Sequence, residues 1–142
     1  MDKKVHDYLS GYDIRPSLQR IAVMEYLMTH KTHPTADEIY IALAPAIPTL
    51  SRTTIYNTLS TLLSCGAIQS LDLDSGRMHY DGDTSPHAHF ICTRCGAIHD
   101  IFPASGHWEQ ALAAVPPPEG TAVSGAQLSY KGLCAKCNKT DN

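Results

Sequence analysis

The sequence predicts a mixed α+β fold made of two small modules, and three observations lead to this prediction. The region from residue 17 to residue 66 has the apolar spacing of short amphipathic helices. The region from residue 67 to residue 102 changes to strand-like runs separated by turn-forming residues. A polar, turn-rich stretch at 81–86 separates two parts of the chain. We therefore expect one module over residues 1–82 and a second over residues 83–142.

The composition is that of an ordinary folded protein. The chain has 142 residues, of which 43% are hydrophobic and 18% are charged, and its mean hydropathy is -0.19. This balance can bury enough apolar surface to offset chain entropy, which argues against extensive disorder. No apolar run approaches the ~20 residues that span a bilayer, and the first residues lead into no signal-peptide stretch. We expect a cytoplasmic protein with no membrane partner.

The net charge alone does not indicate a nucleic-acid-binding protein. The formal net charge is -3, and the first eighty residues carry seven Lys/Arg against eight Asp/Glu. The remaining residues carry four against six, so neither half is basic. Any contact with DNA must therefore come from the local placement of a few cationic and polar side chains.

Three helices are expected in the first module, each preceded by a residue that can cap its N-terminus. Ser17 begins the first, with an apolar face of Ile21, Met24, Leu27 and Met28. Thr35 and Glu38 form a capping box for the second, with an apolar face of Ala36, Ile39, Tyr40 and Leu43. Ser51 begins the third, which ends near Gly66 and has an apolar face of Ile55, Leu59, Leu62 and Leu63.

A β-hairpin is expected after the third helix. Residues 67–73 and 77–81 have strand-like patterns, and Asp74, Ser75 and Gly76 form a turn signal between them. Three helices followed by a hairpin is the element order of a winged helix, a variant of the helix-turn-helix. Other small α+β domains show the same order, so this pattern leaves the fold of the module open.

The second module is expected to contain strands and one helix. Strand-like runs cover residues 87–92 and 97–102, and a helical piece lies around 108–114. Pro116, Pro117 and Pro118 end that helix. A last strand-like run covers residues 121–130 and leads to the terminal cysteines.

Two C-x-x-C pairs suggest a metal site. Cys92 and Cys95 form one pair, and Cys134 and Cys137 form the other. Four thiolates can enclose Zn²⁺ in a closed tetrahedral site, which is structural because no position remains for a substrate. A redox dithiol is the alternative, although one pair would suffice for that role. Cys65 has no partner nearby in sequence, and we expect a lone buried thiol.

A second donor set contains histidine and aspartate. His87 and His89 alternate in a predicted strand, so their imidazoles face the same side. Asp100 lies in the next strand, Asp81 at the end of the hairpin, and His33 before the second helix. Three imidazoles and two carboxylates without a thiolate suit Fe(II) or Mn(II) better than a structural zinc. Alternating histidines on a surface strand are the alternative explanation.

Four segments together resemble the ferric uptake regulator family, in the family's order and at its spacing from about residue 13 onward. The segments are HPTADEIY at 33–40, TTIYNTL at 53–59, HAHFICTRCG at 87–96 and CAKC at 134–137. The resemblance implies an N-terminal winged-helix DNA-binding domain and a C-terminal α/β dimerisation domain with a zinc site. It assigns structural zinc to the four paired cysteines. It also implies a regulatory Fe(II) or Mn(II) between the domains, held by His33, Asp81, His87, His89 and Asp100.

The resemblance also implies a function and a set of DNA contacts. Family members are metal-dependent repressors that bind a near-palindromic double-stranded DNA operator as homodimers, and they are not enzymes. Candidate DNA contacts are Arg15, Arg52, Tyr56 and Asn57. At three positions this sequence resembles the peroxide-responsive members of the family: Asp81, Asp100 and Asn57.

Other functions stay open at this point. An iron-, manganese- or zinc-uptake regulator would use the same scaffold. A mononuclear iron enzyme could use the histidine and carboxylate cluster as an open site, and a zinc module could serve protein contacts alone. DNA binding that requires added divalent metal separates the regulator from the enzyme and from the zinc module.

Overall fold

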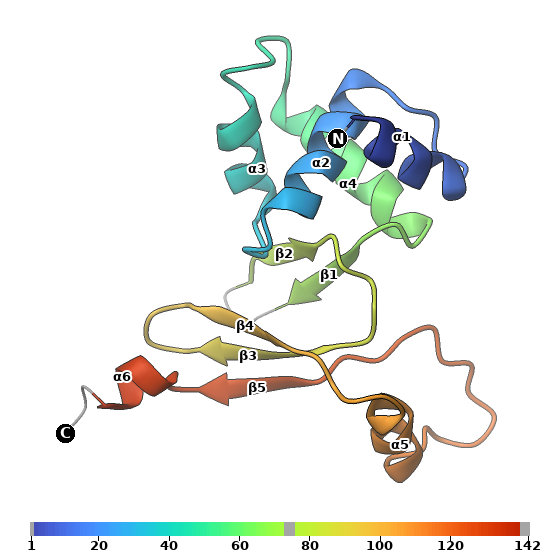
Figure 1. Ribbon diagram of the computed structural model, residues 1–142, viewed down its shortest axis with the longest axis vertical. Helices are drawn as coiled ribbons and strands as arrows, with labels where there is room; N and C mark the ends of the chain where they lie inside the picture. Colours follow the sequence, from blue (N-terminus) through green and yellow to red (C-terminus); the bar gives the residue numbers. More distant parts are fainter. Residues whose placement is uncertain (1, 73–75, 140–142) are drawn as a thin grey trace. The chain divides into compact units, whose positions relative to one another are not determined.

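The chain divides into two compact units, residues 1–84 and 85–142 (Figure 1). The structure is a computed structural model, and it describes residues 2–72 and 76–139. The sequence places the boundary at 82/83, within the same polar stretch.

The first unit contains four helices and a two-stranded sheet. The elements are α1 (Asp2–Gly11), α2 (Leu18–Thr29), α3 (Ala36–Leu43), α4 (Arg52–Ser64), β1 (Gln69–Asp72) and β2 (Met78–Asp81). The three predicted helices and the predicted hairpin are confirmed. The sequence analysis did not predict α1, whose Val5 and Leu9 are fully buried.

Local capping explains where the three predicted helices begin. The hydroxyl of Ser17 accepts a hydrogen bond from the Arg20 N–H, and that of Thr35 accepts one from the Glu38 N–H. Ser51 does the same for α4 through the Thr54 N–H. Each bond satisfies a backbone donor that has no partner within its helix. Gly66 has a φ of +85°, which glycine adopts without strain, and it turns the chain away from α4.

The core of the first unit lies among the apolar faces of these helices. Met24 on α2, Ile39 on α3 and Leu59 on α4 are each 0% exposed and belong to one cluster of packed side chains. Leu9 of α1 and Tyr80 of β2 join the same cluster. Replacing one of the large buried residues with Ala is expected to cost ~2–5 kcal/mol. This packing fixes the positions of the hairpin and of α4, whose opposite face is exposed.

The hairpin places the end of β2 beside the loop that precedes α3. The strands β1 and β2 are antiparallel, with Gln69 opposite Asp81 and Asp72 opposite Met78. His79 of β2 also pairs with Thr35 in an isolated antiparallel bridge. Of the predicted turn, Asp74 and Ser75 lie outside the described residues, and Gly76 has a φ of +72°.

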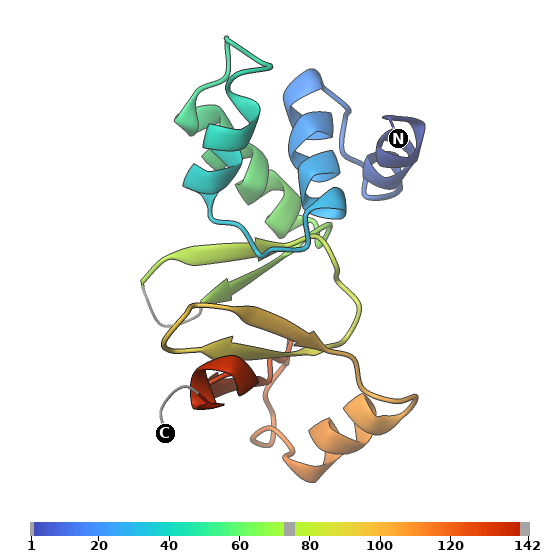
Figure 2. The same cartoon turned by 60° about the vertical axis from the view of Figure 1, so that its left-hand side comes forward.

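The second unit contains a three-stranded sheet and two helices (Figure 2). The elements are β3 (Ala88–Cys92), β4 (Ile98–Ile101), α5 (His107–Ala114), β5 (Ser129–Gly132) and α6 (Ala135–Lys139). The strand β3 is central, antiparallel to β4 and parallel to β5. The two predicted strands at 87–102 and the predicted helix are confirmed, and α6 was not predicted.

The predicted strand over 121–130 is wrong, because only its last two residues belong to β5. The register explains the difference. Ser129 is opposite His89, and the central strand begins one residue earlier, at Ala88. Residues before 128 therefore have no part of β3 opposite them with which to pair as a strand.

In the described part of the chain, every helix is too short or too polar to cross a membrane.

Candidate functional site

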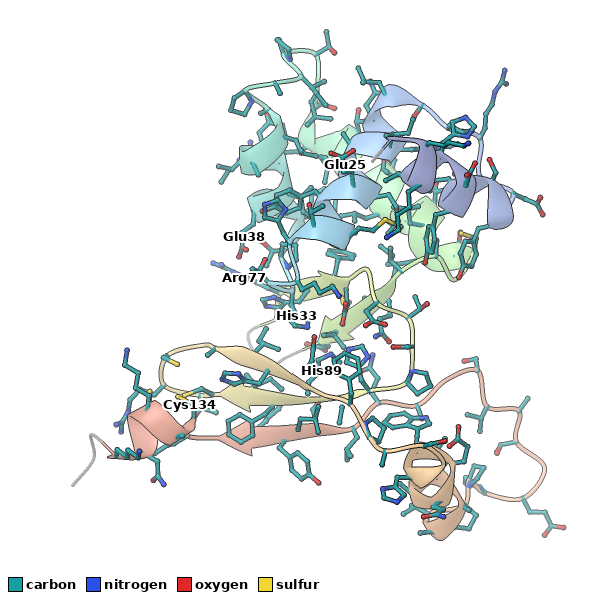
Figure 3. The ribbon with its side chains drawn as sticks, in the orientation of Figure 1. Glu25, His33, Glu38, Arg77, His89 and Cys134 are labelled. Carbon is teal, nitrogen blue, oxygen red and sulfur yellow. The ribbon has the colours of Figure 1, made fainter. Side chains whose placement is uncertain are left out.

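The four paired cysteines lie together in the second unit. Cys92 ends β3, and Cys95 lies in the turn before β4. Cys134 lies directly before α6, and Cys137 lies within it. Figure 3 shows Cys134 beside the turn that joins β3 and β4. The four sulfur atoms lie within 4.8 Å of one another, and Cys95 Sγ is 3.8 Å from Cys134 Sγ. Tetrahedral zinc with ~2.3 Å bonds separates its sulfur ligands by about 3.8 Å, so the arrangement suits zinc.

Backbone hydrogen bonds shape this cluster. The N–H groups of Cys95 and Cys134 lie 3.5 Å and 3.4 Å from Cys92 Sγ and donate to it. These bonds, that of Cys95 first, lower the pKa of Cys92 to about 5. A hydrogen bond with Cys134, followed by burial, raises the pKa of Cys137 to about 12. The cluster therefore contains one thiol that ionises readily, as a metal ligand must.

Cys65 corrects one expectation of the sequence analysis. The residue was expected to be a lone buried thiol, but it is exposed and its thiol lies 3.3 Å from the Leu62 carbonyl oxygen. The chain turns at Gly66, and Ala67, which is 0% exposed, takes the next core position. The side chain of Cys65 is therefore left at the surface at the end of α4.

The first unit brings together His33 and Asp81. His33 lies in the loop before α3, and Asp81 is the last residue of β2. His33 Nε2 is 3.5 Å from Asp81 Oδ2, and the two residues are only 4% and 5% exposed. The other carboxylate oxygen of Asp81 accepts a hydrogen bond from the Asp83 N–H at 2.9 Å. A buried carboxylate is costly to desolvate, so such an arrangement requires partners of this kind.

The second unit brings together His87, His89 and Asp100. His89 Nε2 and His87 Nε2 lie 3.4 Å and 3.6 Å from the same oxygen, Asp100 Oδ1. His87 and His89 are 4% and 2% exposed, and their ring centroids are 4.5 Å apart. His89 and Asp100 are directly opposite each other in the β3–β4 pair, which explains their approach. The Ser85 carbonyl oxygen lies 2.7 Å from His87 Nδ1 and orients that ring.

The donor chemistry of these two groups fits a divalent metal ion that prefers nitrogen and oxygen ligands. Each histidine Nε2 is directed at a carboxylate oxygen of its own unit, and no sulfur takes part. Imidazole with carboxylate is a donor set used for Fe(II) and Mn(II). Each unit therefore contains residues of the kind that could ligate such an ion.

The candidate DNA contacts are distributed over the surface of the first unit. Tyr56 is 51% exposed and Asn57 is exposed, both on α4. Arg15 is exposed in the loop before α2, and its carbonyl oxygen accepts a hydrogen bond from the Arg20 side chain. Asn57 and Arg20 line one hollow of about 300 Å³ on this surface. These side chains are available to an external partner.

Arg52 is already engaged within the unit. Its Nε donates to Asp37 Oδ1 at 3.2 Å, and its guanidinium carbon lies 4.5 Å from the centre of the Tyr40 ring. Both contacts connect the start of α4 with α3. A guanidinium has five N–H donors, so the Asp37 contact leaves others for DNA.

Comparisons with known proteins match this chain to one family. A sequence profile of the ferric uptake regulator family matches residues 12–129. The peroxide operon regulator of Bacillus subtilis (strain 168) is 36% identical over 141 residues, which is 99% of this chain and 95% of the relative. The peroxide-responsive repressor PerR of Staphylococcus epidermidis is 35% identical over 130 residues, or 91% of this chain and 85% of the relative.

Solved structures agree with the fold. The ferric uptake regulator Fur of Helicobacter pylori, which has three functional metal-binding sites, aligns with a TM-score of 0.74 and 18% identity. The alignment covers 99% of this chain and 93% of that one. PerR from Streptococcus pyogenes aligns with a TM-score of 0.52 and 28% identity, over 94% and 90% of the two chains. The profile match over most of the sequence, together with these relatives, shows that the chain belongs to the ferric uptake regulator family of metal-responsive regulators.

Proposed function

We propose that this protein is a metal-dependent transcriptional repressor that senses peroxide through Fe(II). The observation that carries the proposal is the pair of buried donor groups: His33 with Asp81 in the first unit, and His87 and His89 with Asp100 in the second. The similarity to peroxide-responsive repressors supports the same function.

The five residues together would hold one regulatory ion. The first unit offers two donor groups and the second offers three, so neither unit alone would supply all five ligands. An ion with five protein ligands would require both units at once. Binding of the ion would therefore favour the arrangement of the units that binds DNA. The size of this effect would be set by the difference between the ion's affinity for that arrangement and its affinity for arrangements that do not bind DNA.

The peroxide response would then depend on the chemistry of the bound metal. Fe(II), when bound, would promote cleavage of the O–O bond of hydrogen peroxide, which is the two-electron oxidant: one oxygen atom would be added to a ligand imidazole and the other would leave as water. His33 and His87 are the imidazoles that we expect to gain an oxygen atom. An oxidised imidazole is a weaker ligand, so the two units would no longer be held together and the repressor would leave its operator. Mn(II) does not carry out this chemistry readily and should leave the protein insensitive.

The zinc would have a purely structural role. Four thiolates fill a tetrahedral site, which leaves no position for a substrate. The site would join the end of β3 to α6, two segments about forty residues apart in sequence. Zinc bound there would stabilise the second unit directly, because the unfolded chain has no preformed site.

A homodimer formed through the second unit is supported by its exposed apolar surface. Every residue from 109 to 131 is exposed in the single chain. The unit's exposed large apolar residues are Ile101, Phe102, Leu112, Val115, Val123, Leu128 and Tyr130. Apolar surface of this extent is typical of an interface. A two-fold dimer would present two copies of α4, which matches a near-palindromic operator.

The helix α4 would read the operator. Asn57 can bond adenine through two hydrogen bonds, and Tyr56 can pack on a thymine methyl group. Arg15 would contact phosphate, which positions the protein without specifying sequence. Arg52 would use the N–H groups that its contact with Asp37 leaves available, so its main effect would be on the orientation of α4.

An anaerobic titration of operator binding with Fe(II), Mn(II) and Zn(II) tests the proposal. His33→Ala and His89→Ala each remove one ligand from a different unit, and both should abolish metal-dependent binding. His99→Ala is a matched control because His99 is exposed and lies next to Asp100 on β4. Operator binding that is equal with and without metal would contradict the proposal and favour an enzyme or a structural zinc module.

A further inference from the structure

His33 has a backbone conformation that needs support. Its φ is +55°, and it is one of only two residues other than glycine with a positive φ in the described part of the chain. The left-handed conformation costs a residue with a Cβ atom free energy, and such residues persist when their surroundings fix them. His33, a proposed metal ligand, therefore has a backbone conformation that needs support from its surroundings.

The side chain of His79 supports that position. His79 Nδ1 lies 2.7 Å from the carbonyl oxygen of His33. A carbonyl oxygen only accepts hydrogen bonds, so Nδ1 carries the hydrogen and donates it. The main chain of β2 adds further contacts: the Tyr80 N–H donates to the Pro34 carbonyl oxygen at 2.9 Å, and His79 pairs with Thr35. Figure 3 shows His33 on this loop, next to β2.

Two residues of one strand thus hold two different parts of His33. His79 and Asp81 are two positions apart in β2, so their side chains lie on the same face of the strand. His79 holds the His33 main chain, while Asp81 faces the His33 ring at 3.5 Å. The main-chain position and the ring direction of His33 are both set by β2.

We infer that His79 is a positioning residue for the regulatory metal, acting through the His33 main chain and not as a ligand. The inference rests on the proposed function of His33. Without the Nδ1 donor, the His33 carbonyl loses one hydrogen bond and the left-handed conformation loses one of its supports. The imidazole of His33 would then be presented to the metal less often, and the affinity for the metal would fall.

Two variants of His79 and one control separate this role from a general effect on folding. His79→Leu has similar bulk and no donor, whereas His79→Asn keeps an N–H group close to the position of Nδ1. His99→Leu removes an exposed histidine from β4 as the control. Competition with a metal-sensitive dye gives the Mn(II) affinity of each zinc-loaded protein. We expect His79→Leu to lose about 10- to 100-fold in affinity, the usual range for residues behind a ligand. His79→Asn should recover most of this loss, and His99→Leu should match the parent protein.

A second measurement uses the protein without regulatory metal. Backbone NMR shifts and couplings of His33 report its conformation in zinc-loaded protein free of Mn(II) and Fe(II). We expect the left-handed conformation in the parent and in His79→Asn, and a shift away from it in His79→Leu. An unchanged His33 conformation and unchanged Mn(II) affinity in His79→Leu would overturn the inference. If His33→Ala itself leaves the Mn(II) affinity unchanged, the proposed function of His33 is wrong, and the NMR result alone then decides whether His79 positions the loop.

Discussion

The Nε atom of Arg52 lies 3.2 Å from Oδ1 of Asp37, and this ion pair joins the first residue of α4 to α3. The guanidinium also lies over the ring of Tyr40, again on α3. Arg52, which precedes Tyr56 and Asn57 on α4, is thus in contact with the neighbouring helix α3. If α4 reads the operator as proposed, this contact would help to set the angle at which the helix meets DNA.

A double-mutant cycle on Asp37→Ala and Arg52→Ala measures the pair. Because both side chains are more than half exposed, we expect a coupling of ~0.2–1 kcal/mol in the free energy of unfolding, decreasing with added salt. The same cycle with Glu38→Ala in place of Asp37→Ala is the control and should give almost no coupling. Equal coupling for the two acidic residues would mean that the Asp37 contact does not form in solution.

Replacing one zinc ligand tests the four-cysteine cluster. Cys134→Ser should lose about one zinc per chain, and the dimer with it, because the ion holds β3 and α6 together. Cys65→Ser removes the exposed thiol outside the cluster and should retain both zinc and dimer. Metal analysis and sedimentation provide the readouts. A folded, zinc-free dimer of Cys134→Ser would show that the cluster has no structural role.

The reading role of α4 predicts a change in sequence preference. Asn57→Arg should change operator preference by roughly 1–3 kcal/mol at one base pair, since Arg favours guanine where Asn favours adenine. Arg15→Ala should instead weaken binding to all sequences and reduce the salt dependence. Binding to an operator library measures both effects. The same preference in the parent and in Asn57→Arg would exclude this residue from base recognition.

Tyr8 predicts a pH dependence in the alkaline range. Its hydroxyl donates to the Ala67 carbonyl oxygen at 2.6 Å, and burial, followed by the hydrogen bond with Tyr12, raises its pKa from 10.0 to about 12. A raised pKa means that the folded state keeps the proton more strongly than the unfolded state. The stability that Tyr8 contributes is therefore complete below pH 10 and is lost as the pH rises towards 12.

The variant Tyr8→Phe tests this dependence. It should lower the free energy of unfolding by about 1 kcal/mol near neutral pH, because the Ala67 carbonyl loses its partner. It should also reduce the decline in stability at alkaline pH. Denaturant unfolding across the pH range gives both values, and Tyr130→Phe, which alters an exposed tyrosine, is the control. An identical alkaline decline in Tyr8→Phe would contradict the role of this hydroxyl.

Short-range signals account for the parts of the fold that could be predicted. Ser17, Thr35 and Ser51 cap their helices through hydrogen bonds to residues three positions away, so the sequence itself contains both partners. The helix α1 was not predicted, although its Val5 and Leu9 are four positions apart and so lie on one helical face. Its spacing was the signal that could have found it.

Contacts between distant segments account for the errors. The start of β5 depends on where β3 begins, and the exposure of Cys65 depends on Ala67 filling the core. The support of His33 by His79 joins residues 46 positions apart, and no local pattern announces it. The sequence could indicate which residue types hold a metal, but it could not show which side chain supports a ligand's main chain.

Peptide mass spectrometry after peroxide treatment tests directly whether the protein senses peroxide through Fe(II). Protein loaded with zinc and Fe(II), and matched protein loaded with zinc and Mn(II), would each be treated with hydrogen peroxide and digested. We expect one added oxygen on the peptide containing His33 or His87 in the iron form alone, together with loss of operator binding. Oxidation confined to Cys65 or the methionines, with operator binding preserved, would contradict peroxide sensing and leave a regulator that responds to metal alone.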